Sequence, residues 1–297
     1  MAFTAKCPKC KQEAALAFTI DLAQKVINCS CGNIAPALGL SFNPNPEFLF
    51  KYRPHDCYSE SWILKEELFF SSPAMFNDPF DSKVMYSNEG TLDQKKKYLC
   101  RLFEKMHPGI KKKKKWELVN KSLKDQILEK DHDNHIIRIQ QKIDGLGVVS
   151  FSRKPDDLLM FSYYAKDHTG YCLKYRRSSD NVLSMAQVVN YEENYPKFSI
   201  YDLASEKIGV VGDKVLYTKA NCWKHEDEWR ISFSNFTRIA VKSFHPILEG
   251  IILGCKMKPE QRNEIISLNK RRAKPVAMLE ARKKKFEFAL EIIPVSL

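Results

Sequence analysis

The chain has 297 residues, of which 44% are hydrophobic and 28% are charged. This ordinary globular composition argues against a disordered, collagen-like or fibrous protein. At about 150 residues per domain, the length suggests one large domain with an accessory module, or two medium domains. No stretch approaches the roughly 18 consecutive apolar residues of a membrane-spanning helix, and the start MAFTAKCPKC has no targeting pattern. We therefore expect a cytoplasmic protein with no membrane partner.

The formal net charge of +12 is concentrated in two segments. Residues 91–130 carry a net charge of +8 and residues 271–285 carry +6, so the remainder is close to neutral. Lysine runs give affinity for phosphates without reading a base sequence, which indicates a nucleic-acid partner. A solvated helix face is the alternative explanation. The residues expected to contact nucleic acid are Lys111, Lys112, Lys113, Lys114 and Lys115.

Residues 1–42 are predicted to form a small zinc ribbon of their own. Cys7-x-x-Cys10 and Cys29-x-Cys31 place two thiolate pairs on either side of 18 residues, a spacing typical of a tetrahedral Zn²⁺ site. Four thiolates leave no open coordination position, so the metal would be structural and would stabilise a module with a very small core. Buried free thiols and a redox pair are the alternatives, and a disulfide framework suits a reducing compartment less well.

Two prolines in residues 43–46 mark a linker, and a main domain is expected over residues 47–297. The predicted elements give an α+β fold with a mixed, mainly antiparallel sheet core and flanking helices, preceded by the zinc ribbon. In chain order they are a strand at 48–53, a helix at 62–67, an apolar run at 68–70, a lysine-rich helical insertion at about 91–144 that is interrupted at Pro108-Gly109, a strand at 148–152, a helix at 158–166, strands at 170–175 and 188–191, a helix at 200–208, strands at 229–234 and 250–254, and a helix at 259–272.

Several blocks of the main domain occur in a recognisable order. They are KYR at 51–53, LFFSSP at 68–73 running into FNDPFD at 76–81, the segment 147–175 with its SFS, WxxExEWR at 223–230 and GIILG at 250–254. Together these blocks resemble a bacterial domain-of-unknown-function family, family twenty-nine seventy-one. The resemblance covers residues 48 to about 290 and implies a single family domain there. It implies no chemistry for the zinc module or the lysine-rich segment, which lie outside it.

Three shorter features are similar, in chain order, to those of ADP-ribosyltransferases. They are Arg53 on an early strand, Ser150-Phe151-Ser152 on a later strand, and Glu226-Asp227-Glu228 before a third. This similarity implies that NAD is the substrate, because cleavage of its nicotinamide bond creates an oxocarbenium-like sugar that a carboxylate stabilises.

The similarity also implies a role for each residue. Glu228 would stabilise the sugar and Glu226 would receive or deprotonate the acceptor. Ser150 and Ser152 lie on one face of a strand, where one would brace the site and the other would hydrogen-bond the glutamate. The expected NAD-binding residues are Arg53 at the pyrophosphate, Asn77, Asp78, and Tyr163 or Tyr164 stacked on nicotinamide.

Structural explanations exist for the same residues. Arg53 could pair with Asp78 or Asp81, and Asn77-Asp78-Pro79 is also the sequence of a tight turn. The ExE segment could be a solvated loop, although the flanking tryptophans favour burial, in which case Arg230 or Lys224 would have to compensate the carboxylates.

The sequence therefore predicts an ADP-ribosyltransferase-like enzyme that transfers ADP-ribose from NAD to a nucleic acid or a nucleic-acid-associated target, as a defence or toxin effector. One alternative is a non-catalytic nucleic-acid-binding or sensor protein. Another is a metal-dependent nuclease in which Asp78, Asp81, Glu226 and Glu228 hold Mg²⁺.

Overall fold

The chain divides into two compact units. The first contains the described residues of 73–146 and 190–221, and the second contains those of 3–72, 147–189 and 222–297. The computed structural model describes residues 18–21, 26–29, 34–36, 45–87, 89–126, 132–178, 181–199, 201, 212, 214–234, 236–242 and 247–295.

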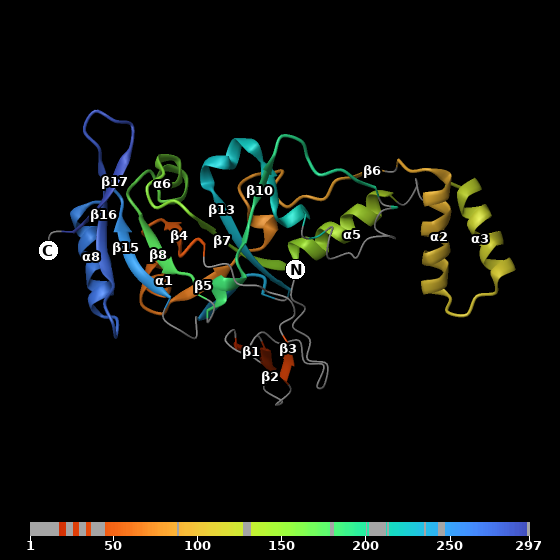
Figure 1. Cartoon of the computed structure of the whole chain (residues 1–297), viewed down its shortest axis with the longest axis horizontal. Coiled ribbons are helices and arrows are strands. Elements are labelled where there is room, and N and C mark those ends of the chain that lie inside the picture. The colour runs from red at the N-terminus through yellow and green to blue at the C-terminus, as the bar shows by residue number, and fades with distance from the viewer. Residues whose placement is uncertain are drawn as a thin grey trace. The chain divides into compact units, whose positions relative to one another are not determined.

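An eight-stranded sheet forms the centre of the second unit (Figure 1). Its strands lie in the order β17-β16-β15-β8-β4-β7-β13-β9. The pairs with a recorded register are antiparallel except for β15 with β16, so the expected mixed, mainly antiparallel sheet with helices is confirmed. The strands are β4 (Phe48–Arg53), β7 (Leu146–Ser152), β8 (Tyr171–Arg176), β9 (Gln187–Val188), β13 (Glu228–Ser234), β15 (Leu248–Leu253), β16 (Ala277–Lys283) and β17 (Leu290–Pro294).

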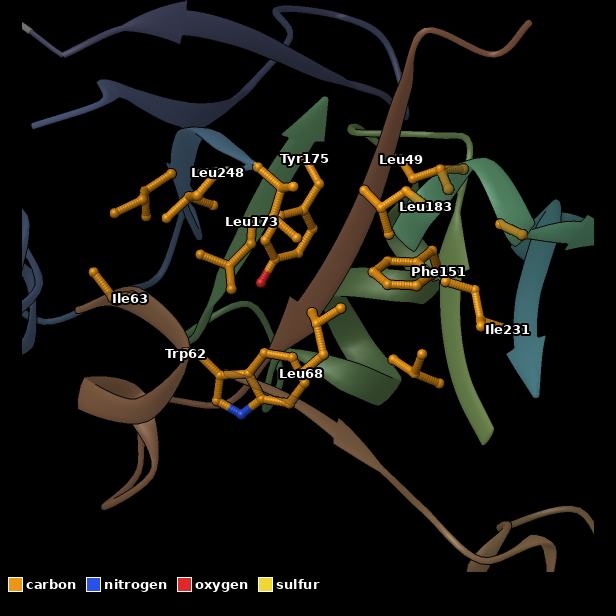
Figure 2. Packing of buried hydrophobic residues seen from close by; sticks show 14 of the residues in the cluster. Leu49, Trp62, Ile63, Leu68, Phe151, Leu173, Tyr175, Leu183, Ile231 and Leu248 are labelled. Atoms are coloured by element: carbon orange, nitrogen blue, oxygen red, sulfur yellow. The ribbon is translucent and has the colours of Figure 1, made fainter. Parts of the chain in front are cut away.

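Each face of this sheet buries its own apolar cluster, because side chains alternate along every strand. Leu49, Phe151 and Tyr175 belong to the cluster that includes Trp62, and Figure 2 shows their side chains converging. Phe50 and Tyr52 belong to the other cluster, with Phe161 of a helix. The helices of this unit are α1 (Ser59–Ile63), α6 (Leu158–Tyr164) and α8 (Pro259–Lys270), with 3-10 turns η2 (Val182–Met185) and η4 (Asn221–Glu226), the latter starting at the boundary between the units.

The first unit contains the lysine-rich helices. Thr91 and Gln94 form a capping box at the start of the first of them, and the helix stops before Gly109, whose φ of +84° favours glycine. Its elements are η1 (Pro73–Met75), β6 (Tyr86–Ser87), α2 (Leu92–Met106), α3 (Lys112–Lys124), α5 (His132–Asp144), β10 (Asn190–Glu192), β11 (Phe198–Ser199) and β12 (Thr218–Ala220); β6 pairs with β11, and β10 with β12.

A separate three-stranded antiparallel sheet lies near the start of the chain. It consists of β1 (Phe18–Asp21), β2 (Val26–Cys29) and β3 (Ile34–Pro36). Cys7, Cys10 and Cys31 lie outside the described residues, and Cys29 is described only as the last residue of β2. The zinc ribbon therefore stays a prediction.

Several elements differ from the expectation. The helix predicted at 62–67 is instead α1, which ends at Ile63, because the following residues form β5 (Glu67–Phe70) and pair with β14 (Ile239–Lys242). The strand predicted at 188–191 is two short strands, since Val188 ends β9 and Asn190 begins β10 in another sheet. The predicted helix at 200–208 lies almost wholly outside the described residues, and strands β16 and β17 were missed.

Candidate functional site

Three neighbouring strands bring the KYR, SFS and ExEWR blocks together. Strand β4 pairs with β8 along its whole length, but its register with β7 consists of the single pair Phe50↔Ser152. Strand β13 lies on the other side of β7. Strands β4 and β7 therefore diverge beyond that one pair, and the sheet loses its regular hydrogen bonding there.

Register partners point to the same side of a sheet, which decides where the serines lie. Ser152 is opposite Phe50, a member of the cluster on the α6 face. Val149 and Phe151 belong to the other cluster. Ser150 and Ser152 therefore both face the α6 side.

The two glutamates lie on that same side. Trp229 and Ile231 pack in the cluster with Trp62, so Glu228 and Arg230, which alternate with them on β13, face α6. Glu226 is only 2% exposed and accepts a hydrogen bond of 2.6 Å from the hydroxyl of Tyr164 in α6.

Ser152 links strand β7 to the turn that carries the glutamates. Its Oγ donates to the main-chain oxygen of Glu226 at 2.6 Å and accepts from the amide of Lys154 at 3.0 Å. The Lys154 ammonium in turn donates to the His225 oxygen at 3.2 Å. These bonds fix the position of the 3-10 turn η4 relative to the strand, and they join Ser152 to the main chain of Glu226 rather than to its carboxylate.

Glu228 forms a buried ion pair with Arg230. Two parallel bonds of 2.7 and 2.8 Å join the Arg230 guanidinium to the two carboxylate oxygens, and the residues are 1% and 5% exposed. Arg230 is thus the compensating cation that burial of the glutamates required. Asp227, between the glutamates, has a φ of +45° and pairs instead with Arg153 at 2.8 Å. This left-handed residue lets both flanking glutamates be buried while Asp227 faces another partner.

Lys51 is a cation beside this site, at the divergence of β4 and β7, that the sequence analysis missed. It is half-buried on β4, and its Nζ donates to the Ser150 oxygen at 2.7 Å, across the divergence of β4 and β7. Burial, followed by the charge of Arg53, lowers the pKa of Lys51 to about 8, while Glu228 and Glu226 act in the opposite direction. Alternation along β4 gives Lys51 the face of Arg53, so the sequence offered no signal for its contact with β7, which depends on the divergence of β4 and β7.

An aromatic trio of Tyr163, Trp223 and His225 adjoins the glutamates. The ring centroids are 6.2 Å apart for Tyr163 and Trp223, 6.3 Å for Tyr163 and His225, and 6.0 Å for Trp223 and His225. Tyr163 is 58% exposed. Trp223 and His225 are half-buried, and an exposed ring beside them can stack against a planar heterocycle. Tyr163 and His225 directly precede Tyr164 and Glu226, whose side chains are hydrogen-bonded to each other.

Arg53 lies on the other face of the sheet. Its guanidinium carbon is 4.9 Å from the centroid of the Trp62 ring, and Nη2 pairs with Asp56 at 3.3 Å. Its Nε is buried and has no hydrogen-bond partner among the described residues. The structure therefore brings Ser150, Ser152 and the glutamates to one face but leaves Arg53 on the opposite face.

Asn77 and Asp78 belong to the first unit. Asp78 Oδ1 accepts from the Phe80 amide at 2.9 Å, so the tight-turn interpretation of this segment is confirmed. Asn77 is exposed. Asp81 forms a buried ion pair with Lys219 at 3.6 Å. Asp56, rather than Asp78 or Asp81, is the recorded ion-pair partner of Arg53.

No protein-family model, curated protein or solved structure matches this chain. Within the described residues, no three His, Cys, Asp or Glu side chains are grouped so that they could hold a metal ion. The helices of the described part of the chain include none with the length and apolar character needed to cross a bilayer.

The buried ion pair predicts a large loss of stability when its cation is removed. Arg230→Leu leaves the Glu228 carboxylate buried without its bidentate partner and should lower the free energy of unfolding by about 3–5 kcal/mol, measured by urea denaturation. Arg176→Leu is the matched control, because Arg176 pairs with Glu47 and Glu249 at the surface and its removal should change little. Equal effects of the two substitutions would contradict the interpretation.

The lowered pKa of Lys51 predicts a pH-dependent contribution to stability. Between pH 8 and about 10.5 the unfolded chain binds more protons at this residue than the folded chain, so the free energy of unfolding should rise with pH. The difference in unfolding free energy between the parent and Lys51→Met should therefore increase across this window and stay constant below it. Lys51→Arg stays charged throughout and serves as the control. A difference for Lys51→Met that does not change from pH 7 to 10.5 would disprove the shift.

Proposed function

We propose that this protein is an ADP-ribosyltransferase-like enzyme that transfers ADP-ribose from NAD to a nucleic acid or a nucleic-acid-associated target. The observation that supports this most strongly is that Glu226 and Glu228 lie on the same face as Ser150 and Ser152. The serines and glutamates, which follow one another along the chain in the order expected of such an enzyme, are thus also neighbours in space. The adjoining aromatic trio offers rings for one of the two heterocycles of NAD.

The proposed reaction breaks the bond between the ribose C1′ and the nicotinamide nitrogen. Nicotinamide leaves with the bonding electron pair, and a nucleophile of the target forms the new bond at C1′. Glu228 would stabilise the positive charge on the sugar. The Glu226 carboxylate would accept the proton that the target nucleophile loses. Tyr163 would stack on nicotinamide, and Tyr164 holds the Glu226 carboxylate through its 2.6 Å bond.

The pyrophosphate of NAD requires cations, and two are available on β4. Lys51 lies where β4 and β7 diverge and is within electrostatic range of both glutamates. We propose that Lys51 binds the pyrophosphate together with Arg53, whose forked guanidinium suits phosphate oxygens. Both residues alternate to the face opposite the glutamates, so the ligand would have to reach them where β4 and β7 diverge, and Arg53 would have to exchange its bond with Asp56 for the ligand.

The lysine-rich helices support a polyanionic target. Lys111, Lys112, Lys113 and Lys114 are exposed. The first turn of α3 contains no acidic residue, and Lys114 pairs with Glu117 of the next turn at 3.9 Å. Lys115 is half-buried and donates to Glu104 at 2.5 Å. Four exposed ammonium groups at the positive end of a helix dipole repel one another, and phosphate groups would relieve that repulsion.

A non-catalytic nucleic-acid-binding or sensor protein is the second candidate. It is favoured by the observation that both glutamates are engaged in internal bonds, Glu226 with Tyr164 and Glu228 with Arg230. In that case the carboxylates would maintain the shape of a binding surface. Ligand binding without turnover would identify this function.

The enzyme proposal predicts carboxylate-dependent turnover of NAD. The full chain, incubated with labelled NAD and mixed DNA, RNA and protein, should release nicotinamide and transfer label. Glu228→Gln and Glu226→Gln should each lower kcat/KM about a hundredfold or more, because the stabilising charge or the proton acceptor is lost. Release of nicotinamide by chromatography and label on the target are the measurements.

Asp227→Asn is the matched control for this experiment. Asp227 lies between the two glutamates in the sequence but pairs with Arg153, so this substitution should retain most activity. Thermal midpoints of all three variants separate lost chemistry from lost folding. Absence of both label transfer and free nicotinamide, with Glu228→Gln indistinguishable from the parent, would refute the enzyme and leave the binding protein.

We also propose that Cys7, Cys10, Cys29 and Cys31 hold one structural Zn²⁺ in a reducing, cytoplasmic environment. The position of Cys29 at the end of β2, in a three-stranded antiparallel sheet, supports a ribbon around the second thiolate pair. The metal would stabilise residues 1–42 and take no part in the reaction.

The zinc proposal predicts one Zn²⁺ per chain after purification under reducing conditions, measured by elemental analysis. Cys29→Ser and Cys10→Ser should each lower the zinc content and make the linker at 43–46 more susceptible to proteolysis, because the module depends on its metal. Cys57→Ser is the matched control, since Cys57 is an exposed free cysteine in the main domain. A parent protein without zinc, or equal zinc in Cys29→Ser and Cys57→Ser, would contradict this assignment.

A further inference from the structure

The connection between β16 and β17 presents two phenylalanines to solvent. The strands are in register up to Lys283 and Leu290, and the Lys284 amide closes the loop by donating to the Ala289 oxygen at 3.0 Å. Phe286 is 95% exposed and Phe288 is 103% exposed. In Figure 1 this connection is the dark blue loop beyond β17, at the edge of the sheet. We call residues 284–289 the hairpin tip.

Full exposure of two neighbouring phenylalanines is unusual, because each ring loses the free energy that burial of its apolar surface would supply. The two rings lie beyond the last residue pair of the edge strands, out of reach of the apolar clusters. At the tip, the Lys285 ammonium lies 5.1 Å from the centroid of the Phe286 ring. The rings therefore contribute little to the stability of the fold. Burial against another molecule would recover the free energy that their exposure to water costs.

The charge around the tip selects the kind of partner. Four basic residues run consecutively from Arg282 to Lys285. Of these, Arg282 pairs with Glu280 at 3.0 Å, and Lys284 pairs with Glu287 at 3.2 Å. Among the residues that the structure describes, neither Lys283 nor Lys285 forms an ion pair with an acidic side chain. The tip is therefore positive, and its partner should be negatively charged.

We propose that the hairpin tip binds single-stranded nucleic acid, with Phe286 and Phe288 stacked on unpaired bases and Lys283 and Lys285 against the phosphates. Aromatic rings beside cations are the combination by which proteins hold single strands, because every base has a face on which a ring can stack. A duplex offers its phosphates but not its base faces. The inference deepens the proposed function by naming the form of its target. It rests on the nucleic-acid part of that function and needs no NAD chemistry.

An anionic membrane would also attract lysines, but the tip is less suited to it. Glu287 stands between the two phenylalanines, so insertion of both rings into lipid would carry a carboxylate towards the hydrocarbon. The tip also has no Trp or Tyr, the residues that anchor proteins at the membrane–water boundary. On a nucleic acid the rings can stack while the Glu287 carboxylate stays in water.

The test measures binding of the full chain, without NAD, to fluorescent single-stranded dT20 and rU20 and to a 20-bp duplex. Phe286→Ser combined with Phe288→Ser should weaken single-strand binding at least tenfold while duplex binding changes little. Phe80→Ser, at another exposed phenylalanine, is the matched control and should bind like the parent. Lys283→Gln with Lys285→Gln should reduce the salt dependence, by about 0.7 in the log–log slope per lost phosphate contact.

Two further variants make the outcome specific. Glu287→Gln removes the charge nearest the phosphates and should tighten binding about twofold to threefold, a direction opposite to that of the other substitutions. Release of nicotinamide is measured separately on the same preparations. Failure of the enzyme proposal would abolish that release and leave single-strand binding intact, so it is distinguishable from failure of this inference. A parent that does not bind single strands would overturn the inference, as would a double phenylalanine variant with unchanged affinity. Loss of binding to phosphatidylserine vesicles alone in that variant would reassign the tip to lipid.

Discussion

The buried ion pair between Glu228 and Arg230 is the interaction on which the candidate site depends. Two ionised groups leave water here, and the cost is offset because the guanidinium meets both carboxylate oxygens at once. Both residues lie on β13, so one face of that strand carries buried charged side chains instead of apolar ones. Next to it, Ser152 and Glu226 extend the polar network from β7 to α6. One side of this sheet is therefore a hydrocarbon core, whereas the other side, around β7 and β13, is held by hydrogen bonds and charges. A polar network of this kind must be satisfied throughout, because each group left unpaired would be costly.

Much of the sheet could be predicted from local sequence. Strands such as β4, β7, β8 and β15 are buried on both sides, so they stand out as short apolar runs between turn residues. Strands β16 and β17 lie at the edge, where charged residues alternate with apolar ones, and their pattern resembles that of a polar loop. The break between β9 and β10 depends on partners in two different sheets, which no local window contains.

The candidate site shows the same limit more sharply. The spacing of Ser150 and Ser152 on a strand indicated that they share one face. No such signal existed for Glu226 and Glu228, because Glu226 ends the 3-10 turn η4 and Asp227 has a left-handed φ. The position of Arg53 could not be obtained in this way, because it depends on the register between β4 and β7. A shift of one residue in the pair Phe50↔Ser152 would bring Arg53 to the serine face. Register is set by packing over the whole sheet, and a single sequence does not reveal it.

The place of β4 within the sheet also has a consequence for how the chain acquires its structure. Both neighbours of this central strand, β7 and β8, come about 100 residues or more later in the sequence, after the lysine-rich helices. Ribosomal synthesis proceeds from the N-terminus, so Leu49 and Phe50 stay exposed to solvent until the residues of β7 and β8 have left the ribosome. Long-range pairing of this kind slows folding, and the unpaired apolar strand is open to association with other nascent chains. Assembly of the large sheet is thus governed by its most distant contacts, and the first of its strands to be synthesised is among the last to find its partners.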